Sequence, residues 1–126
     1  MDQQSQHSLI VFAHGARDPA WGQSLERLAQ LIAQRHPSLT VRVAYLELQT
    51  PTLEDAIDEL AAQHDFIAVL PVFWAANGHV VQTLPRALKA AQKRHAHCRF
   101  SALPVLSELP GMLPFIAEAA TSALRK

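Results

Sequence analysis

The stretch LIVFAHGARDP, from Leu9 to Pro19, passes from an apolar segment through a histidine and a glycine to a helix start. An apolar run bounded by turn-forming residues is typical of a buried strand. Gly15 allows a sharp turn after that strand, and Asp18 followed by Pro19 is typical of a helix N-terminus. The stretch therefore predicts a strand that ends at His14 and leads directly into a helix.

The rest of the chain repeats this alternation. Apolar periodicity predicts four strands, each followed by a helix. Because the strands are apolar on both faces, the order favours a parallel sheet with helices on each side, a three-layer αβα sandwich of the α/β class. The expected strands cover residues 8–13, 40–46, 66–73 and 99–103; the expected helices cover 19–35, a segment capped by Thr52, a segment beginning between His79 and Pro85, and the stretch after Pro110. In the first helix, Trp21, Leu25, Leu28 and Ile32 recur at the spacing of one apolar face.

Composition narrows the class of protein. A chain of 126 residues that is 49% hydrophobic can form one domain, which we expect over 1–126 with residues 1–7 as a disordered tail. Eleven basic residues balance eleven acidic ones, so net charge favours neither nucleic acid nor an anionic membrane as a partner. The longest apolar run, 67–76, is too short for a membrane helix. The single cysteine, Cys98, excludes an intrachain disulfide, and a cytoplasmic location is expected.

Two of the seven histidines follow predicted strands. His14 comes after the first strand, His79 shortly after the third, and Glu47 at the end of the second. Since the carboxyl ends of parallel strands meet at one edge of a sheet, where such folds bind ligands, all three side chains are expected at the same rim. Two imidazoles and a carboxylate suit a divalent metal such as Co²⁺, Fe²⁺, Ni²⁺ or Zn²⁺. Spacing alone leaves open the alternative that each is an ordinary loop residue.

Three segments carry a resemblance to a known family. HGARDP, YLELQTP and LPVFWAANGHVVQTLP, in this order, resemble the short class II chelatases, the CbiX and SirB group that inserts cobalt or iron into sirohydrochlorin. The resemblance runs from about Leu9 to Pro85 and more loosely to the end of the chain.

The resemblance implies a metal chelatase, a lyase, and assigns roles to residues. His14 and His79 match the family's metal-binding and catalytic histidines, and Glu47 matches the acidic residue that several members place beside the metal. The chain matches one half of the two-half chelatase sandwich, which implies a homodimer. The implied substrates are a sirohydrochlorin-type tetrapyrrole and Co²⁺ or Fe²⁺, with Ni²⁺ a third candidate, in cobalamin or siroheme biosynthesis; no organic cofactor is implied.

The implied substrate also suggests residues that contact it. Its carboxylates call for local cations, with Arg17 the best candidate; Arg86 and Lys89 come next, although ordinary solvated residues explain these two better. The apolar side chains of Phe73, Trp74 and Leu106 could face the flat macrocycle.

The chain departs from the family pattern at two positions, and rival functions stay open. Many members have serine where this chain has Ala16, and aspartate where it has Thr83. A cytoplasmic protein that binds or delivers a divalent metal would use the same site without the reaction. A regulatory module is a further alternative, whereas a histidine phosphatase is disfavoured because Ala13 stands where that mechanism needs an arginine.

Overall fold

The computed structural model describes residues 7–15, 18–76 and 78–125, except for the side chains of 78–81. Strands and helices alternate along the chain, as predicted. They are β1 (His7–Ala13), α1 (Pro19–Arg35), β2 (Thr40–Tyr45), α2 (Leu53–Ala61), β3 (Phe66–Pro71), α3 (Gly78–Arg94), β4 (Arg99–Ala102), a short 3₁₀ helix (Leu106–Glu108) and α4 (Met112–Leu124).

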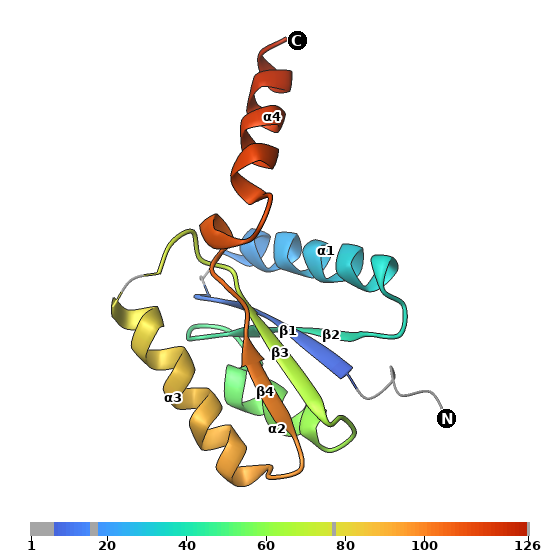
Figure 1. Ribbon diagram of the computed structural model, residues 1–126, viewed down its shortest axis with the longest axis vertical. Coiled ribbons are helices and arrows are strands. Elements are labelled where there is room, and N and C mark those ends of the chain that lie inside the picture. The colour runs from blue at the N-terminus through green and yellow to red at the C-terminus, as the bar shows by residue number, and fades with distance from the viewer. Residues whose placement is uncertain (1–6, 16–17, 77, 126) are drawn as a thin grey trace.

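The four strands form one sheet in the order β2-β1-β3-β4, with every neighbouring pair parallel. Helix α1 covers one face, and α2 and α3 cover the other (Figure 1). This arrangement confirms the predicted three-layer α/β sandwich.

Side-chain alternation along β1 divides the core between the two faces. Ile10 and Phe12 pack with α2 and α3, whereas Val11 and Ala13 pack with α1. All four side chains are at most 7% exposed. A strand that is buried on both faces needs apolar residues at every position, which explains the continuous apolar sequence LIVFA.

The predicted N-terminal caps of the first two helices are present. The Asp18 carboxylate accepts a hydrogen bond from the Ala20 amide at 2.9 Å, and the Thr52 hydroxyl accepts one from the Asp55 amide at 3.2 Å. Each satisfies an amide that the first helical turn leaves without a partner. These caps set where α1 and α2 begin relative to the strands before them.

Two predicted boundaries near the third strand were wrong. β3 ends at Pro71, and its pairing with β1 continues only through the Val72 amide, which donates to the Phe12 carbonyl at 2.7 Å. α3 begins at Gly78, so Pro85 lies inside the helix and not in its first turn. A proline there lacks the amide proton for one helical hydrogen bond, and packing of Leu84 and Ala91, both buried, offsets that loss.

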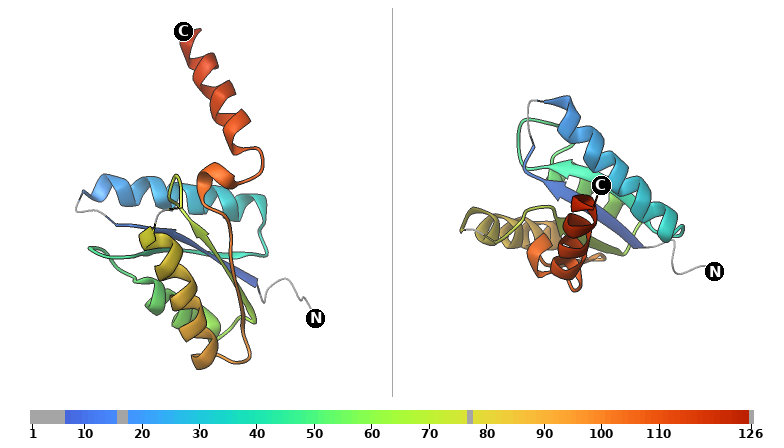
Figure 2. Two further views of the ribbon diagram at one scale, coloured as in Figure 1. Left: turned by 60° about the vertical axis from the view of Figure 1, so that its left-hand side comes forward. Right: turned by 90° about the horizontal axis from the view of Figure 1, so that it is seen from above.

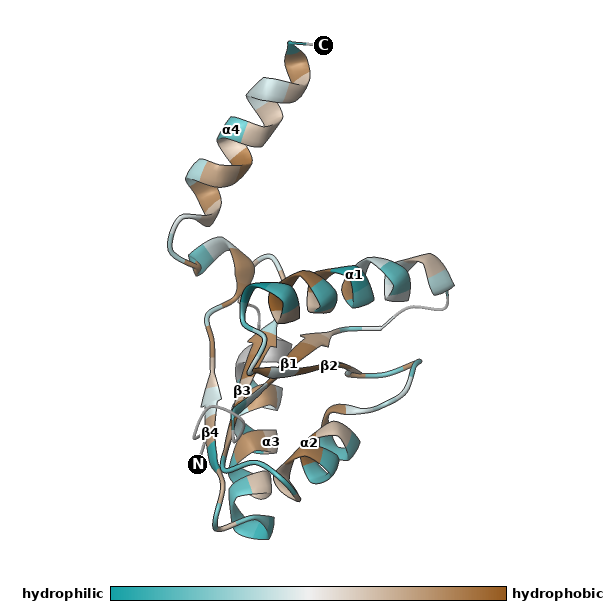
Figure 3. Cartoon of the chain, turned by 90° about the vertical axis from the view of Figure 1, so that its right-hand side faces the viewer, coloured by the Kyte–Doolittle hydropathy of each residue, from teal (hydrophilic) through white to brown (hydrophobic). Residues whose placement is uncertain are grey.

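The last helix lies away from the rest of the fold. α4 projects away from the sheet in Figure 1 and in the left view of Figure 2, and none of its residues is buried. Along α4, brown segments alternate with pale and teal ones (Figure 3), and Glu118 is its one charged residue. Sequence predicted the helix, but not that it would leave the sandwich. Among the described residues, no helix has the length and apolar character needed to cross a membrane.

Candidate metal site at the strand ends

The site lies where the direction of winding reverses. The connection from β1 to β2 runs over one face of the sheet through α1, and the connection from β2 to β3 crosses the other face through α2. Ligands of such folds bind at the carboxyl ends of the strands beside this switch point. His14 is the first residue after β1, so the fold places it there.

Two backbone hydrogen bonds bring the loops after β1 and β2 into contact. The Leu46 amide donates to the Ala13 carbonyl at 2.9 Å, and the Glu47 amide donates to the His14 carbonyl at 3.1 Å. Parallel pairing thus continues past the last residues of both strands. As a result, His14 and Glu47 lie side by side although they are 33 residues apart.

Gly15 makes this close approach possible. Its φ is +100°, and a Cβ atom at this position would overlap the Glu47 carbonyl oxygen. Only glycine combines the left-handed backbone with the absence of a side chain. The histidine-glycine pair is therefore a geometric requirement for placing His14 against Glu47.

The side chains of His14 and Glu47 meet at the rim. His14 Nε2 lies 3.3 Å from Glu47 Oε2, and the two side chains are 55% and 56% exposed. Two ligand atoms about 2.1 Å from one ion lie about 3.0 Å apart at an octahedral angle and about 3.4 Å apart at a tetrahedral angle. The observed separation therefore suits either a hydrogen bond donated by Nε2 or a metal ion bound by both atoms.

An aromatic side chain packs against the imidazole of His14. The rings of His14 and Phe73 lie 6.5 Å apart in an edge-to-face arrangement, and Phe73 packs on the buried Phe12 at 5.8 Å. The structure thus brings the predicted residue Phe73 to His14. Its backbone is held in turn by the Leu106 amide, which donates to the Phe73 carbonyl at 2.9 Å.

Trp74, also predicted at the rim, is 54% exposed. Its carbonyl accepts a hydrogen bond from the Ser107 amide at 2.9 Å. The long loops after β3 and β4 therefore hold each other in place, which leaves the indole of Trp74 open to solvent beside them.

The remaining predicted site residues are placed only in part. The His79 backbone lies in the first turn of α3, after β3 and at the same edge of the sheet, but its side chain is outside the described part of the chain. Arg17 falls outside the described residues altogether. Among the side chains that the structure describes, which do not include those of 78–81, no group of three or more histidine, cysteine, aspartate or glutamate residues could hold a metal ion.

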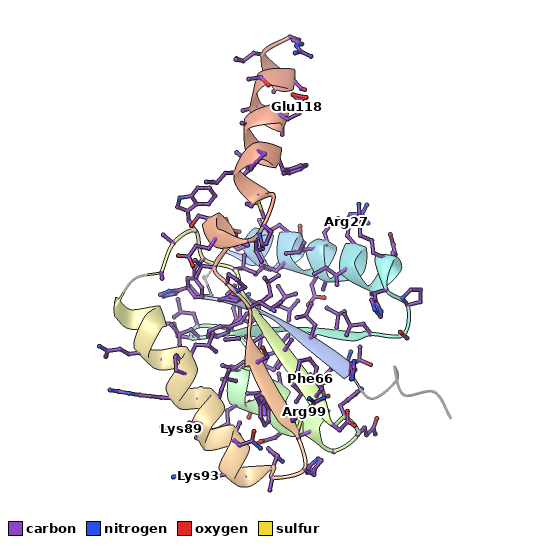
Figure 4. The ribbon with its side chains drawn as sticks, viewed as in Figure 1. Arg27, Phe66, Lys89, Lys93, Arg99 and Glu118 are labelled. Atoms are coloured by element: carbon purple, nitrogen blue, oxygen red, sulfur yellow. The ribbon has the colours of Figure 1, made fainter. Side chains whose placement is uncertain are left out.

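The weaker cation candidates on α3 are exposed to solvent. Lys89 points outward from the middle of the helix, as Lys93 does further along (Figure 4). Arg86 is likewise exposed, which agrees with ordinary solvated residues.

A pocket beside His14 was not predicted from the sequence. It has a volume of about 380 Å³ and lies between the end of the sheet and the first turns of α1. Its lining residues are Ala13, His14, Gly15, Trp21, Ser24, Leu25, Gln49 and Val72.

Helical spacing predicts Trp21 on the apolar face of the first helix, yet the residue is 63% exposed. The reason is its position: the first turn of a helix that follows a parallel strand starts beyond the end of the sheet, where there is no core to pack against. That position could have indicated a wall of the ligand site.

An all-parallel α/β sheet with a histidine and a carboxylate at its switch point defines a class of protein that binds its ligand at the strand ends. Within that class, the family model described as CbiX matches residues 8–123. The chain therefore belongs to the CbiX family, as the resemblance had indicated.

Curated relatives share part of the sequence. A sirohydrochlorin cobaltochelatase from Methanosarcina acetivorans is 33% identical over 86 residues, which cover 68% of this chain and 66% of the relative. One from Methanocaldococcus jannaschii is 30% identical over 89 residues, covering 70% of this chain and 62% of the relative. The matched segments thus span slightly less than two thirds of these relatives.

Two solved structures resemble the fold. A CbiX protein from Marinobacter aquaeolei VT8 superposes with a TM-score of 0.81, at 23% identity, over 94% of this chain and 98% of that one. The sirohydrochlorin chelatase SirB from Bacillus subtilis subspecies spizizenii, solved in complex with cobalt, superposes with a TM-score of 0.67, at 25% identity, over 79% of this chain and 43% of that one.

Proposed function

We propose that this protein is a sirohydrochlorin chelatase that inserts a divalent metal, Co²⁺ first, into the tetrapyrrole. The observation that carries the proposal is the pair formed by His14 and Glu47, whose side-chain atoms lie 3.3 Å apart in an exposed position at the switch point. The curated relatives, named sirohydrochlorin cobaltochelatases, support both the substrate and the metal.

The chemistry of insertion explains why an open, incomplete ligand set is suitable. The tetrapyrrole loses two N–H protons for each M²⁺ that it gains, so the site must both present a metal ion and accept protons. Two imidazoles and a carboxylate leave coordination positions free, whereas four protein ligands would retain the ion as a structural one. In the proposal, His79 joins His14 and Glu47 around the incoming ion.

The same side chains can accept the protons. When the ion moves to the pyrrole nitrogens, the imidazole and the carboxylate that it leaves behind become free bases. One proton for an imidazole and one for Glu47 balance the reaction. Arg17, Phe73 and Trp74 are proposed to contact the macrocycle, Arg17 through one of its carboxylates and the two aromatic residues through its flat face.

Replacement of each histidine by alanine tests the proposal. His14→Ala and His79→Ala should each lower the initial rate of cobalt insertion, followed by the absorbance change of sirohydrochlorin, by about a hundredfold or more. His36→Ala removes a histidine at the far end of α1 and should leave the rate unchanged. A folded His14→Ala variant with the full rate would defeat the catalytic assignment.

The choice of metal and pathway is the finer part of the proposal. Imidazole and carboxylate ligands accept Co²⁺, Fe²⁺ and Ni²⁺, and cobalamin and siroheme synthesis begin from the same macrocycle. Initial rates with the three ions would rank them. Tight metal binding without turnover of any tetrapyrrole would instead favour the alternative function, a cytoplasmic protein that binds or delivers a divalent metal.

The proposal includes a homodimer. The aligned region makes up 43% of the SirB chain and 79% of this one, so two copies of this chain would match the length of a SirB-type protein. α4 supports the assembly, because Glu118 is the one charged residue between Met112 and Leu124 and none of the residues of this helix is buried. A helix of 13 residues is marginal alone in water, so burial of its exposed apolar side chains, such as Phe115, against a second copy would stabilise it.

A further inference from the structure

We propose that the pocket beside His14 receives one edge of the tetrapyrrole and that Trp21 is a positioning residue lying against the flat face of the macrocycle. This inference rests on the proposed function. It adds a binding wall, on α1, to the contacts proposed for the loop after β3.

The first argument is the exposure of Trp21 within the pocket. The indole is 63% exposed, whereas Leu25, one turn further along α1, is 9% exposed. Both residues line the pocket. Exposed aromatic surface on a pocket wall next to a candidate metal ligand is a ready surface for stacking with a conjugated ring.

The second argument is that the backbone of this turn is held rigidly. The Trp21 amide donates to the Asp18 carbonyl at 3.1 Å, and the Ser24 hydroxyl donates to the Trp21 carbonyl at 3.0 Å. Because the backbone of Trp21 is already hydrogen-bonded at its amide and its carbonyl, little backbone conformational entropy is lost when a ligand binds against its side chain.

Close packing of Gly22 gives a third argument. A Cβ atom at Gly22 would lie 3.3 Å from the Tyr45 hydroxyl and 3.4 Å from Gln49 Nε2. Tyr45 is 5% exposed. The turn that carries Trp21 therefore rests on a buried side chain at the end of β2, two residues before Glu47.

The size of the pocket limits what it can hold. A volume of about 380 Å³ is near the lower end for small-molecule sites, about 300–1,000 Å³. It suits one edge of a tetrapyrrole, a pyrrole ring with its substituents, and not the whole macrocycle. Since His14 lines the same pocket, an edge bound there brings pyrrole nitrogens toward the imidazole.

Steady-state kinetics test the inference. Trp21→Ala should raise the KM for sirohydrochlorin about five- to tenfold, the order expected for loss of aromatic stacking, and should leave the KM for Co²⁺ and kcat within twofold. Trp21→Phe should recover most of the loss. Leu31→Ala removes another exposed apolar side chain of α1, 40% exposed and absent from the pocket lining, and should change nothing.

Fluorescence gives a second readout that needs no turnover. The chain has two tryptophans, Trp21 and Trp74, so Trp74→Phe leaves Trp21 as the single reporter. Metal-free sirohydrochlorin should quench its emission strongly, with N-acetyltryptophanamide in parallel to correct for light absorbed by the ligand.

The outcomes separate the two proposals. Normal insertion kinetics of Trp21→Ala, together with unquenched Trp21 emission in Trp74→Phe, would overturn the positioning role and leave the chelatase proposal standing. An absence of both insertion and quenching in every variant overturns the chelatase proposal and this inference with it.

Discussion

Gly15 and Glu47 show how much of the site depends on single residues. Gly15 has a φ of +100° and faces the Glu47 carbonyl, and its neighbour His14 meets the Glu47 side chain. The contact between His14 and Glu47 therefore also depends on Gly15, a residue that carries no charge and binds no metal.

Gly15→Ala should destabilise the fold by about 2 kcal/mol or more, because backbone strain adds to a steric clash. It should also weaken Co²⁺ binding, since the two loops must move apart. Urea unfolding and titration of the cobalt absorption bands measure the two effects. Gly111→Ala is the matched control: its φ is +84°, but nothing lies within 4 Å of the added Cβ, so it should show the strain alone, about 1 kcal/mol, and unchanged Co²⁺ binding.

Glu47→Gln keeps the shape of the side chain and removes its negative charge. If the carboxylate binds the ion, Co²⁺ affinity at pH 7 should fall about tenfold or more, measured by calorimetry. Glu59→Gln removes another exposed carboxylate, one that pairs with Arg42 away from the rim, and should leave the affinity unchanged. Equal affinities for all three proteins would remove Glu47 from the ligand set.

At the scale of elements, α4 differs from the other α-helices because none of its residues is buried. Phe115 and Ile116 are 66% and 38% exposed, and burial of such side chains is worth about 1.5–3 kcal/mol each. The double substitution Phe115→Glu and Ile116→Glu should therefore prevent α4 from being buried in a dimer.

Analytical ultracentrifugation measures this effect. The natural chain, 13.9 kDa, should sediment as a dimer of about 28 kDa and the double variant as a monomer. Leu31→Glu, which places a charge on the exposed side of α1, should remain a dimer. A monomeric natural chain at working concentration would contradict the assembly proposed here.

At the scale of the whole molecule, charged contacts join α2 and α3 at the end of the sandwich opposite the metal site. Asp58 on α2 accepts hydrogen bonds from His95 Nε2 at 2.7 Å and from Arg94 at 2.9 Å. The hydrogen bond from His95, followed by those from Arg94 and the nearby positive charges, lowers the pKa of Asp58 below 3.8. Because the native state favours the ionised carboxylate, this contribution to stability is complete above the unfolded pKa and is lost as pH falls through the lowered one.

Asp58→Asn should consequently reduce the free energy of unfolding at pH 6 by less than about 1 kcal/mol, because the Asp58 side chain is 46% exposed and solvent screens the pairs. The difference from the natural chain should shrink as pH falls from 4 towards 2. Urea unfolding at several pH values checks this. A constant Asp58→Asn difference would exclude the linkage.

Local patterns along the chain determined the elements and their order. The continuous apolar run 9–13 identified a strand buried on both faces, and Asp18 and Thr52 marked helix starts because their side chains satisfy the first free amides. The same logic placed His14, Glu47 and the first turn of α3 at one edge of the sheet, since parallel strands must end together. Boundaries at Phe73 and Pro85 were wrong because tertiary packing outweighs local preference there.

Only the tertiary structure decided which residues touch. The contact of His14 with Glu47 depends on pairing between two loops 33 residues apart, and no local signal encodes that pairing. The exposure of Trp21 and the projection of α4 depend on where the sheet ends, so the helical spacing that predicts an apolar face cannot say what that face meets. Periodicity reports the conformation of a segment, whereas a pocket or an uncovered helix is a relation between segments, and it exists only after the chain has folded.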